Sequence, residues 1–406
     1  MSLDIAAIRS QFPILSRTVY DRPLIYLDNA ASSQAPQRVV DAIAKAYVTA
    51  KANVHRGNHL LSQEATDAME AGRVAAARLI NALSRDEIIF TRGTTEALNL
   101  VAATVGESLT EGDEVILSAM EHHSNIVPWH FLRQRKGIVI KVIPLMPDGS
   151  LDLDAYARLL TDRTRVVSVC HASNVLGTIN PVKQMAAMAH RVGALFCVDG
   201  AQSAPHACID VQDIDCDFFA FSSHKVYGPT GIGVLYGRRA ILEQLPPYQG
   251  GGEMIGHVHW DDITWADIPY KFEAGTPDYI GAAAFAAAVD FVEELGMASI
   301  AAHEQQLAEY ARQQMAAIPG MRFFGNATER CGVISFLIGN AHHYDTGMLL
   351  DKMGIAVRTG HHCAQPLMDT LGIEGTVRAS FAVYNTEAEV DTFVNALRRI
   401  APLLDR

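Results

Sequence analysis

Short apolar runs that recur between residues 87 and 236 constrain the fold of this chain more than any other feature. Most of them are separated by segments with helical periodicity, such as Thr95–Val105 and Pro181–Val192. Apolar runs of this length are typical of strands that are buried on both faces of a parallel sheet. We therefore predict a mostly parallel, seven-stranded α/β sheet with strands at Glu87–Thr91, Glu114–Ala119, Ile138–Ile143, Arg165–Cys170, Leu195–Asp199, Asp217–Phe221 and Ile232–Tyr236.

The remaining third of the chain mixes helical and strand patterns. The stretch from Pro246 to Phe272 is polar and predicts an extended loop. An alanine-rich helix follows Gly281. Mixed elements of this kind predict a smaller α+β domain, so we assign residues 24–285 to a large α/β domain and residues 1–23 and 286–406 to the small one. Its predicted elements are a helix over Met297–Ile318, a strand over Gly332–Ile338, a helix over Asp345–Met353 and a strand over Ala356–Thr359.

Composition limits the partners and the compartment. With 406 residues, of which 49% are hydrophobic and 19% charged, the chain can bury a large core. The formal net charge of -12 argues against nucleic acid or an anionic membrane surface as the main partner. The N-terminus lacks the basic start of a signal peptide and no apolar stretch is long enough to span a bilayer, so we predict a soluble, cytoplasmic protein.

Polar clusters follow several of the predicted strands, where open α/β sheets bind their ligands. Lys225 lies between an apolar strand and a glycine-rich turn, which would desolvate its amine and favour a Schiff base. Asp199 ends another strand and could pair with the ring nitrogen of pyridoxal phosphate, which keeps that ring an acceptor of electrons. The alternative is an ordinary solvated lysine, but the Ser, His, Gly and Pro residues around Lys225 favour the cofactor site.

A phosphate-binding turn is predicted at Thr91–Glu96, where a strand ends and a helix begins with free N–H groups. From this segment alone, N-capping by Thr94 or Thr95 is as good an interpretation. Ser222 and His224, on either side of the lysine turn, favour phosphate, and Thr276 is a weaker candidate contact. Gly228–Gly233 lacks the Gly-Lys-Ser/Thr ending of a nucleotide P-loop.

Two further residues have neighbours that suggest chemistry. His123 could lay its imidazole over a flat aromatic cofactor and transfer protons, although a surface histidine is the alternative. Cys363 lies five residues after Arg358, in surroundings that favour a thiolate, and Gly360 would let its loop move. Zinc binding by His361, His362 and Cys363 is disfavoured because adjacent histidines point apart and no fourth ligand is recognisable, so we predict no metal.

Arg378 lies in a strand-like run, from which its guanidinium could grip a substrate carboxylate with two hydrogen bonds. A structural salt bridge is nearly as good an interpretation of the sequence.

The ordered motifs of the chain resemble the cysteine desulfurase and selenocysteine lyase family, in its group II (SufS-like) form. This family belongs to the class-V aminotransferases among the fold-type I pyridoxal-phosphate-dependent enzymes. The resemblance runs nearly from end to end. Its markers are Tyr26–Ala31, Val54–Gly57, Arg92–Glu96, Glu121–His123, Ser173–Val175, Val198–Gln202, Ser223–Gly231, Gly250–Gly252, Phe272–Pro277 and Arg358–Cys363.

The resemblance implies a role for each candidate residue. Lys225 would bind the cofactor covalently, Asp199 would pair with its ring nitrogen, Gln202 would bond its phenolic oxygen and His123 would stack on the ring. The phosphate would be held by Thr94, Thr95, Ser222 and His224, with Thr276 reaching it from the second subunit of a homodimer. The substrate would be held by Arg378 and Asn174, with His55 and Arg358 near its sulfur.

The activity implied by the resemblance is that of a cysteine desulfurase, a transferase of sulfur-containing groups. It would convert L-cysteine to L-alanine and hold the sulfur as a persulfide on Cys363. A SufE-like acceptor protein would then take the sulfur for iron–sulfur cluster assembly. The alternatives are a selenocysteine lyase, which would act on L-selenocysteine, and a non-catalytic scaffold in sulfur trafficking.

Overall fold

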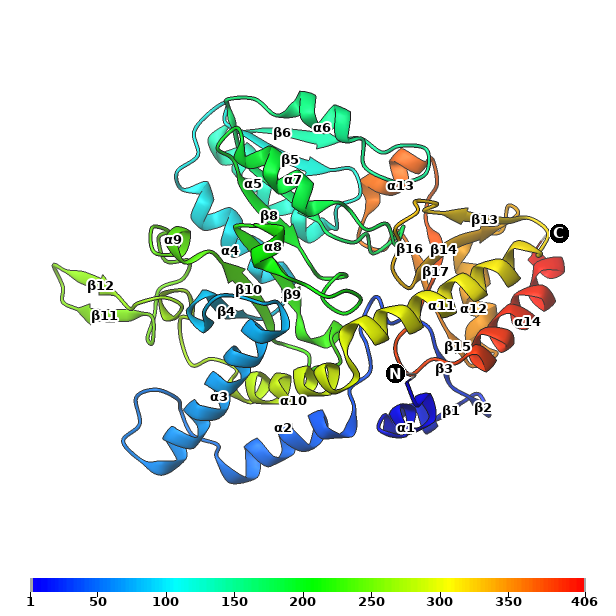
Figure 1. Ribbon diagram of the computed structural model, residues 1–406, viewed down its shortest axis with the longest axis horizontal. Helices are drawn as coiled ribbons and strands as arrows, with labels where there is room; N and C mark the ends of the chain where they lie inside the picture. Colours follow the sequence, from blue (N-terminus) through cyan, green and yellow to red (C-terminus); the bar gives the residue numbers. More distant parts are fainter. Residues whose placement is uncertain (1–2, 405–406) are drawn as a thin grey trace.

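The computed structural model describes residues 3–404, and a seven-stranded sheet is its largest element. The strand order is β4-β10-β9-β8-β7-β5-β6 (Figure 1). Strands β5 to β9 pair in parallel, whereas β10 pairs antiparallel with both β4 and β9. The mostly parallel sheet and each of its predicted strands are therefore confirmed, with β4 at Ile88–Thr91, β5 at Glu114–Ser118, β6 at Val139–Ile143, β7 at Thr164–Cys170, β8 at Leu195–Asp199, β9 at Phe218–Ser222 and β10 at Gly233–Gly237.

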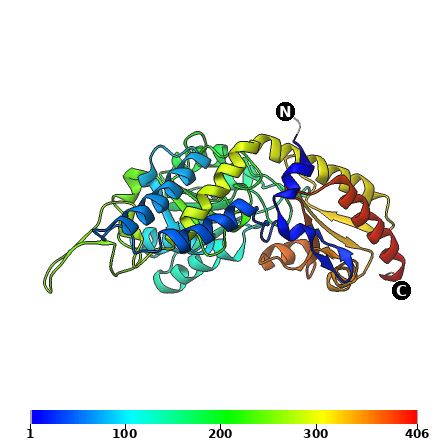
Figure 2. The same cartoon turned by 90° about the horizontal axis from the view of Figure 1, so that it is seen from below.

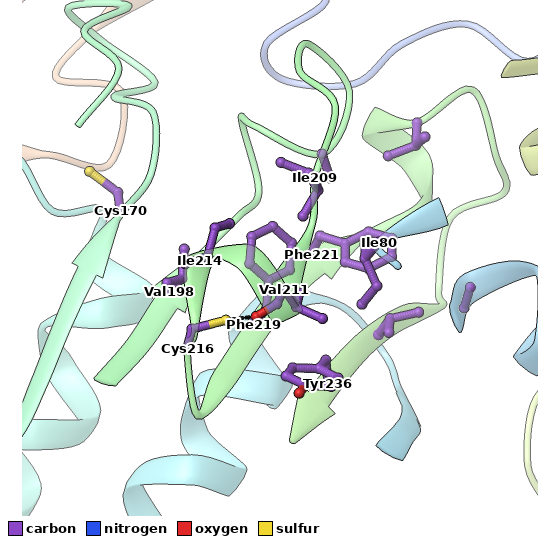
Figure 3. Packing of buried hydrophobic residues seen from close by; sticks show 14 of the residues in the cluster. Ile80, Cys170, Val198, Ile209, Val211, Ile214, Cys216, Phe219, Phe221 and Tyr236 are labelled. Carbon is purple, nitrogen blue, oxygen red and sulfur yellow. Dashed lines mark hydrogen bonds between the residues drawn. The ribbon is translucent and has the colours of Figure 1, made fainter. Parts of the chain in front are cut away.

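Helices cover both faces of this sheet, and alternate strand residues pack against opposite layers. Phe218 and Ala220 of β9 belong to a buried cluster with α4 and α5. Phe219 and Phe221 belong to a second cluster on the other face (Figure 3). Each buried phenylalanine stabilises the fold by about 1.5–3 kcal/mol. The helices of this region are α4 at Thr94–Gly106, α5 at Val127–Lys136, α6 at Leu153–Leu159, α7 at Val182–His190, α8 at Val211–Ile214 and α9 at Arg239–Leu242, with 3-10 turns at Arg85–Glu87, His123–Asn125 and Ser223–Lys225.

A four-stranded antiparallel sheet of order β13-β14-β17-β16 forms a second, smaller part of the chain, at the right of Figure 1. Leu307 of α11, Phe336 of β14, Val377 of β17 and Phe393 of α14 share its buried core. The predicted α+β region is thus confirmed. Its elements are β13 at Met321–Phe324, β14 at Val333–Ile338, β16 at Arg358–Gly360, β17 at Thr376–Ser380, α11 at Met297–Ala316, α12 at His343–Asp351, α13 at Gln365–Leu371 and α14 at Glu387–Leu404.

Segments from the N-terminal region pack against both sheets. Strand β3 (Ile25–Tyr26) pairs in parallel with β15 (Ile355–Ala356). Helices α2, α3 and α10 lie together on one side of the molecule (Figure 2). A Cβ atom at Gly72 of α3 would lie 2.2 Å from the carbonyl oxygen of Ala282 in α10, so this close contact requires glycine. The bounds are α1 Ile5–Ser10, a 3-10 turn Pro13–Ser16, β1 Thr18–Val19, β2 Arg22–Pro23, α2 Gln37–Thr49, α3 Leu60–Leu79 and α10 Tyr279–Leu295.

The loop predicted between Pro246 and Phe272 is wrong in part. It contains a hairpin of β11 (Ile255–Val258) and β12 (Ile263–Trp265), which projects from the body at the left of Figure 1, and a 3-10 turn at its end, Tyr270–Phe272. The side chains of both strands are largely exposed, so no buried apolar run marks them in the sequence.

The single strand predicted over Ala356–Thr359 is also wrong. The structure divides it at Val357 into β15 and β16, which belong to different sheets. One residue between two short strands leaves no pattern by which a sequence could separate them. Within residues 3–404, none of the helices is both long and apolar enough to cross a membrane.

Candidate functional site

A cavity of about 420 Å³ lies where the carboxyl ends of the large-sheet strands face the second sheet. Each polar cluster predicted at those ends contributes at least one residue to it. The second sheet and the loop before α13 supply the other wall. The predicted site residues in its lining are Thr94, Thr95, Asn174, Asp199, Gln202, Ser222, His224, Lys225, Arg358, Cys363 and Arg378.

Lys225 reaches the cavity from the turn that follows β9, and Asp199 ends the neighbouring strand β8. Burial lowers the pKa of the Lys225 amine to about 8, against the opposing charge of Asp199. Burial raises the pKa of Asp199, whose Oδ1 accepts a hydrogen bond of 3.0 Å from the backbone N–H of Ala201. A lysine with this pKa has a much larger neutral fraction near pH 7 than a solvated lysine, and the neutral amine is the nucleophile.

The start of helix α4 forms one end of the cavity together with the residue before the lysine turn. The Ser222 hydroxyl accepts from the Thr94 N–H at 2.8 Å and lies 2.7 Å from the Thr94 hydroxyl. Gly93, which precedes the helix, has φ 152 and no side chain that caps the helix end. Burial lowers the pKa of His224 to about 4, so this imidazole is neutral near pH 7. N–H and hydroxyl groups at a helix start suit a bound phosphate.

Gln202 has an unusual environment for a buried amide. Its Nε2 donates to the carbonyl oxygen of Ala30 at 2.6 Å, whereas its buried Oε1 has no hydrogen-bond partner within residues 3–404. An unpaired buried acceptor costs about 1–3 kcal/mol. Because Gln202 lines the cavity, a bound molecule with a hydroxyl group would satisfy this oxygen.

Two arginines from the second sheet face the same cavity. Arg378 of β17 is 2% exposed, and its Nη1 donates to the carbonyl oxygen of Asn174 at 3.0 Å. Arg358 of β16 is paired with Asp28 at 2.7 Å. The cavity thus carries fixed positive charge opposite the lysine turn, which suits an anionic group on the ligand.

Cys363 lines the cavity from an exposed loop with an unusual backbone. Both His362 and Cys363 have positive φ angles, 52 and 56. The loop is fixed by hydrogen bonds from the Asn174 amide to the His362 carbonyl oxygen at 2.8 Å and from the His123 N–H to the Cys363 carbonyl oxygen at 2.8 Å. A conformation that costs free energy at non-glycine residues is found mostly where the surroundings enforce it, often at functional sites. The loop holds the Cys363 thiol at the cavity that also contains Lys225.

Three predicted site residues lie elsewhere in this chain. His123 is beside the cavity rather than in its lining, and its Nε2 accepts from the Gln365 N–H at 3.1 Å. His55 lies 3.4 Å from Glu70, in a different surface hollow. Thr276 is exposed in a third hollow, with Arg92 and Glu96.

The sequence reasoning missed other residues at the cavity. His122 lines the cavity, whereas the predicted residue, its neighbour His123, does not. Burial lowers the pKa of His122 to about 4. Cys170, which was not among the predicted site residues, also lines the cavity, and burial raises the pKa of its thiol. Glu121 lies behind these two, where burial raises its pKa to about 7, although the Asn125 amide donates to it at 2.7 Å. Their positions directly after β5 and at the end of β7 were the available signal.

Comparisons with known proteins place nearly the whole chain in one family. A model of the family described as Aminotransferase class-V matches residues 25–393. A cysteine desulfurase of Salmonella agona (strain SL483) is 51% identical over 406 residues, which is 100% of both sequences.

Two solved structures share the fold over the same extent. The cysteine desulfurase CsdA from Escherichia coli, in an S-sulfonic acid form, has a TM-score of 0.92 and 40% identity over 100% of both chains. The apo cysteine desulfurase from Thermococcus onnurineus NA1 has a TM-score of 0.94 and 38% identity, over 100% of this chain and 99% of that one.

Proposed function

The chain belongs to the class-V aminotransferase family, and we propose that it is a pyridoxal-phosphate-dependent cysteine desulfurase. It converts L-cysteine to L-alanine and keeps the sulfur as a persulfide on Cys363. The observation that carries this proposal is that Lys225 and Cys363, far apart in the sequence, line one cavity. An amine with a lowered pKa and a thiol at the same cavity are the two groups that this chemistry needs.

The residues of the cavity fit pyridoxal phosphate. Lys225 would bind it covalently, and Asp199 would pair with its ring nitrogen. The unpaired Oε1 of Gln202 would accept from the phenolic hydroxyl, and Thr94, Thr95, Ser222 and His224 would hold the phosphate at the start of α4. When bound, the cofactor supplies an acceptor for the electrons released at the substrate Cα.

The protein side chains then bind the substrate and move its protons and sulfur. Arg378 and Asn174 bind the substrate carboxylate. The neutral amine of Lys225 would remove the Cα proton of the bound substrate. The Cys363 thiolate bonds to the substrate sulfur as the carbon–sulfur bond breaks, and the electrons of that bond stay on the three-carbon fragment, which takes up protons and leaves as L-alanine.

A second copy of the chain completes this site in our proposal. Thr276 of the partner subunit would reach the phosphate, and His55 would line the pocket near the sulfur together with Arg358. His123 would stack on the cofactor ring. To do so, its imidazole would give up the hydrogen bond that it accepts from the Gln365 N–H. The protein would thus act as a homodimer, with residues 24–285 holding the cofactor and residues 1–23 and 286–406 carrying Cys363.

The sulfur leaves through a partner protein in this proposal. Cys363 is on an exposed but fixed loop, so an acceptor has to dock at the cavity mouth rather than wait for the loop to reach it. A SufE-like acceptor in the cytoplasm, supplying iron–sulfur cluster assembly, is the partner we propose. L-Selenocysteine would be a second substrate, since its selenium leaves more readily.

The experiment is to measure L-alanine release and the mass of the protein after incubation with L-cysteine. Wild-type holoenzyme should release alanine and gain one sulfur atom on Cys363. Cys363→Ala should lose both, whereas Cys208→Ala, which removes the other exposed free thiol, should lose neither. Alanine release that persists in Cys363→Ala would refute the persulfide, and borohydride treatment that fails to label Lys225 would refute the cofactor linkage.

A further inference from the structure

Asp28 is a carboxylate with 13% of its side chain exposed, and it holds both arginines of the cavity at once. Its carboxylate accepts from the Arg358 Nε at 3.1 Å and Nη2 at 2.7 Å, and from the Arg378 Nη2 at 3.3 Å. Both arginines belong to the lining of the cavity, and among the described residues that lining does not include Asp28. The carboxylate therefore contacts the guanidinium groups from behind and leaves the space in front of them to a ligand.

We propose that Asp28 is a positioning residue for substrate binding, which fixes Arg378 so that it meets the substrate carboxylate and holds Arg358 beside it, near the sulfur. This inference rests on the proposed function, because that function assigns Arg378 to the substrate carboxylate. Asp28 itself touches neither substrate nor cofactor in this arrangement.

The backbone around Asp28 is held on both sides, so its carboxylate has a defined position. The Leu27 N–H donates to the Ala356 carbonyl oxygen at 2.9 Å, and the Ser380 N–H donates to the Leu27 carbonyl oxygen at 2.8 Å. The Asn29 side chain donates to the Ser380 carbonyl oxygen at 2.6 Å. Asp28 is therefore anchored between β15, which precedes Arg358 in the chain, and β17, which contains Arg378.

The two guanidinium groups need this anchor for different reasons. Arg358 is 49% exposed at its side chain, so without Asp28 it would be free to turn into solvent. Arg378 is 2% exposed, and its Nε has no partner within residues 3–404, so the loss of Asp28 would leave the Nη1 contact with Asn174 as its remaining hydrogen bond. The like charges of the arginines would also face each other without a carboxylate between them.

A purely electrostatic role for Asp28 predicts the opposite result. A negative charge behind the arginines repels a substrate carboxylate, so its removal would tighten binding if charge were its main effect. Loss of positioning weakens binding instead, because the donors must then be ordered as the ligand binds. The sign of the change in affinity separates the two roles.

The test uses two ligands that differ by the carboxylate. L-Alanine and ethylamine are titrated separately into Asp28→Asn holoenzyme and wild-type holoenzyme, and binding is followed by the absorbance of the cofactor. We expect the Kd of L-alanine to rise about tenfold in Asp28→Asn and the Kd of ethylamine to stay within about twofold. Unchanged or tighter binding of L-alanine would overturn the proposal, and so would an equal loss for both ligands.

Two controls keep the test decisive. Asp86→Asn removes a carboxylate that lies 2.6 Å from Arg239, an arginine away from the cavity, and should leave both affinities unchanged. If Asp28→Asn does not fold, Asp28→Glu displaces the carboxylate without removing its charge and should still weaken L-alanine alone; wild-type affinity in that variant overturns the proposal. Failure of the wild-type protein to bind either ligand or to release alanine would instead count against the proposed function.

Discussion

The lowered pKa of Lys225 leads to a quantitative prediction about the attachment of pyridoxal phosphate to the cofactor-free protein. An amine attacks an aldehyde in its neutral form. Burial lowers the pKa of this lysine from 10.5 to about 8; the Asp199 carboxylate opposes the shift and the Arg378 guanidinium adds to it. At pH 7, about one Lys225 amine in ten would be neutral, against about one in three thousand for a solvated lysine.

The assay is the rate at which pyridoxal phosphate attaches to the apoprotein, followed by the absorbance of the cofactor across a range of pH. The rate should rise about tenfold per pH unit and level off above a midpoint near pH 8. Asp199→Asn should move the midpoint to lower pH, because a charge that stabilises the ammonium is gone. Arg378→Met should move it to higher pH, because a charge that destabilises the ammonium is gone; each shift should be about half a unit to one unit.

The opposite signs make this test strict. A wild-type midpoint near the usual lysine pKa would refute the reasoning that burial prepares this amine. Shifts of the same sign in both variants would refute the assignment of the two charges. Lys225→Ala is the control, since the remaining lysines should attach the cofactor without this midpoint.

Three other perturbations test the packing and the site. Arg73→Met should lower the free energy of unfolding by about 3–5 kcal/mol in urea denaturation, since the fully buried Arg73 is paired with Glu273 at 2.6 Å and with Glu70 at 3.1 Å; adding Glu273→Gln should restore part of the loss, because the buried Glu273 side chain then carries no unpaired charge. His206→Ala should cost about 1–3 kcal/mol by the same measurement, because the buried Glu304 carboxylate loses a hydrogen-bond partner 2.6 Å away, and a loss below about 0.5 kcal/mol would contradict a stabilising role for this hydrogen bond. Ser222→Ala should raise the Kd of pyridoxal phosphate about tenfold in equilibrium dialysis, because the Thr94 contacts that shape the start of α4 are lost.

The sheet could be predicted from the sequence because its strands are buried on both faces. Strand β9 is buried at every residue, so Phe218 and Phe219 are both apolar although they face opposite layers. The β11–β12 hairpin has the opposite character, since Trp260 at its turn and most of its strand residues are exposed. Propensity alone does not distinguish such a hairpin from a loop, because its stability comes from pairing across the turn.

The cavity could be predicted in part for a related reason. The carboxyl ends of parallel strands meet at one edge, so residues after them, such as Asp199 and Lys225, converge whatever their separation in the sequence. No comparable rule predicts the position of Asp28. Its partner Arg358 is 330 residues away, and the two meet because β3 pairs with β15 in a short contact of two residues that no periodicity reveals. Long-range polar contacts therefore had to come from the structure.

Thr276, which one chain leaves outside the cavity, has a location that bears on assembly. Thr276 lies in a hollow that also contains Arg92 and Glu96, which surround the start of α4, and Thr94 and Thr95 at that start line the cavity. In a two-fold symmetric dimer every contact occurs twice. If a residue of one copy contacts an element of its partner, the same residue of the partner contacts the same element of the first copy. A two-fold axis near the start of α4 would therefore bring Thr276 of each copy to the phosphate end of the other copy's cavity. We expect cofactor affinity to fall when the proposed homodimer is diluted, since each phosphate site would then lose the Thr276 hydroxyl that its own chain places outside the cavity.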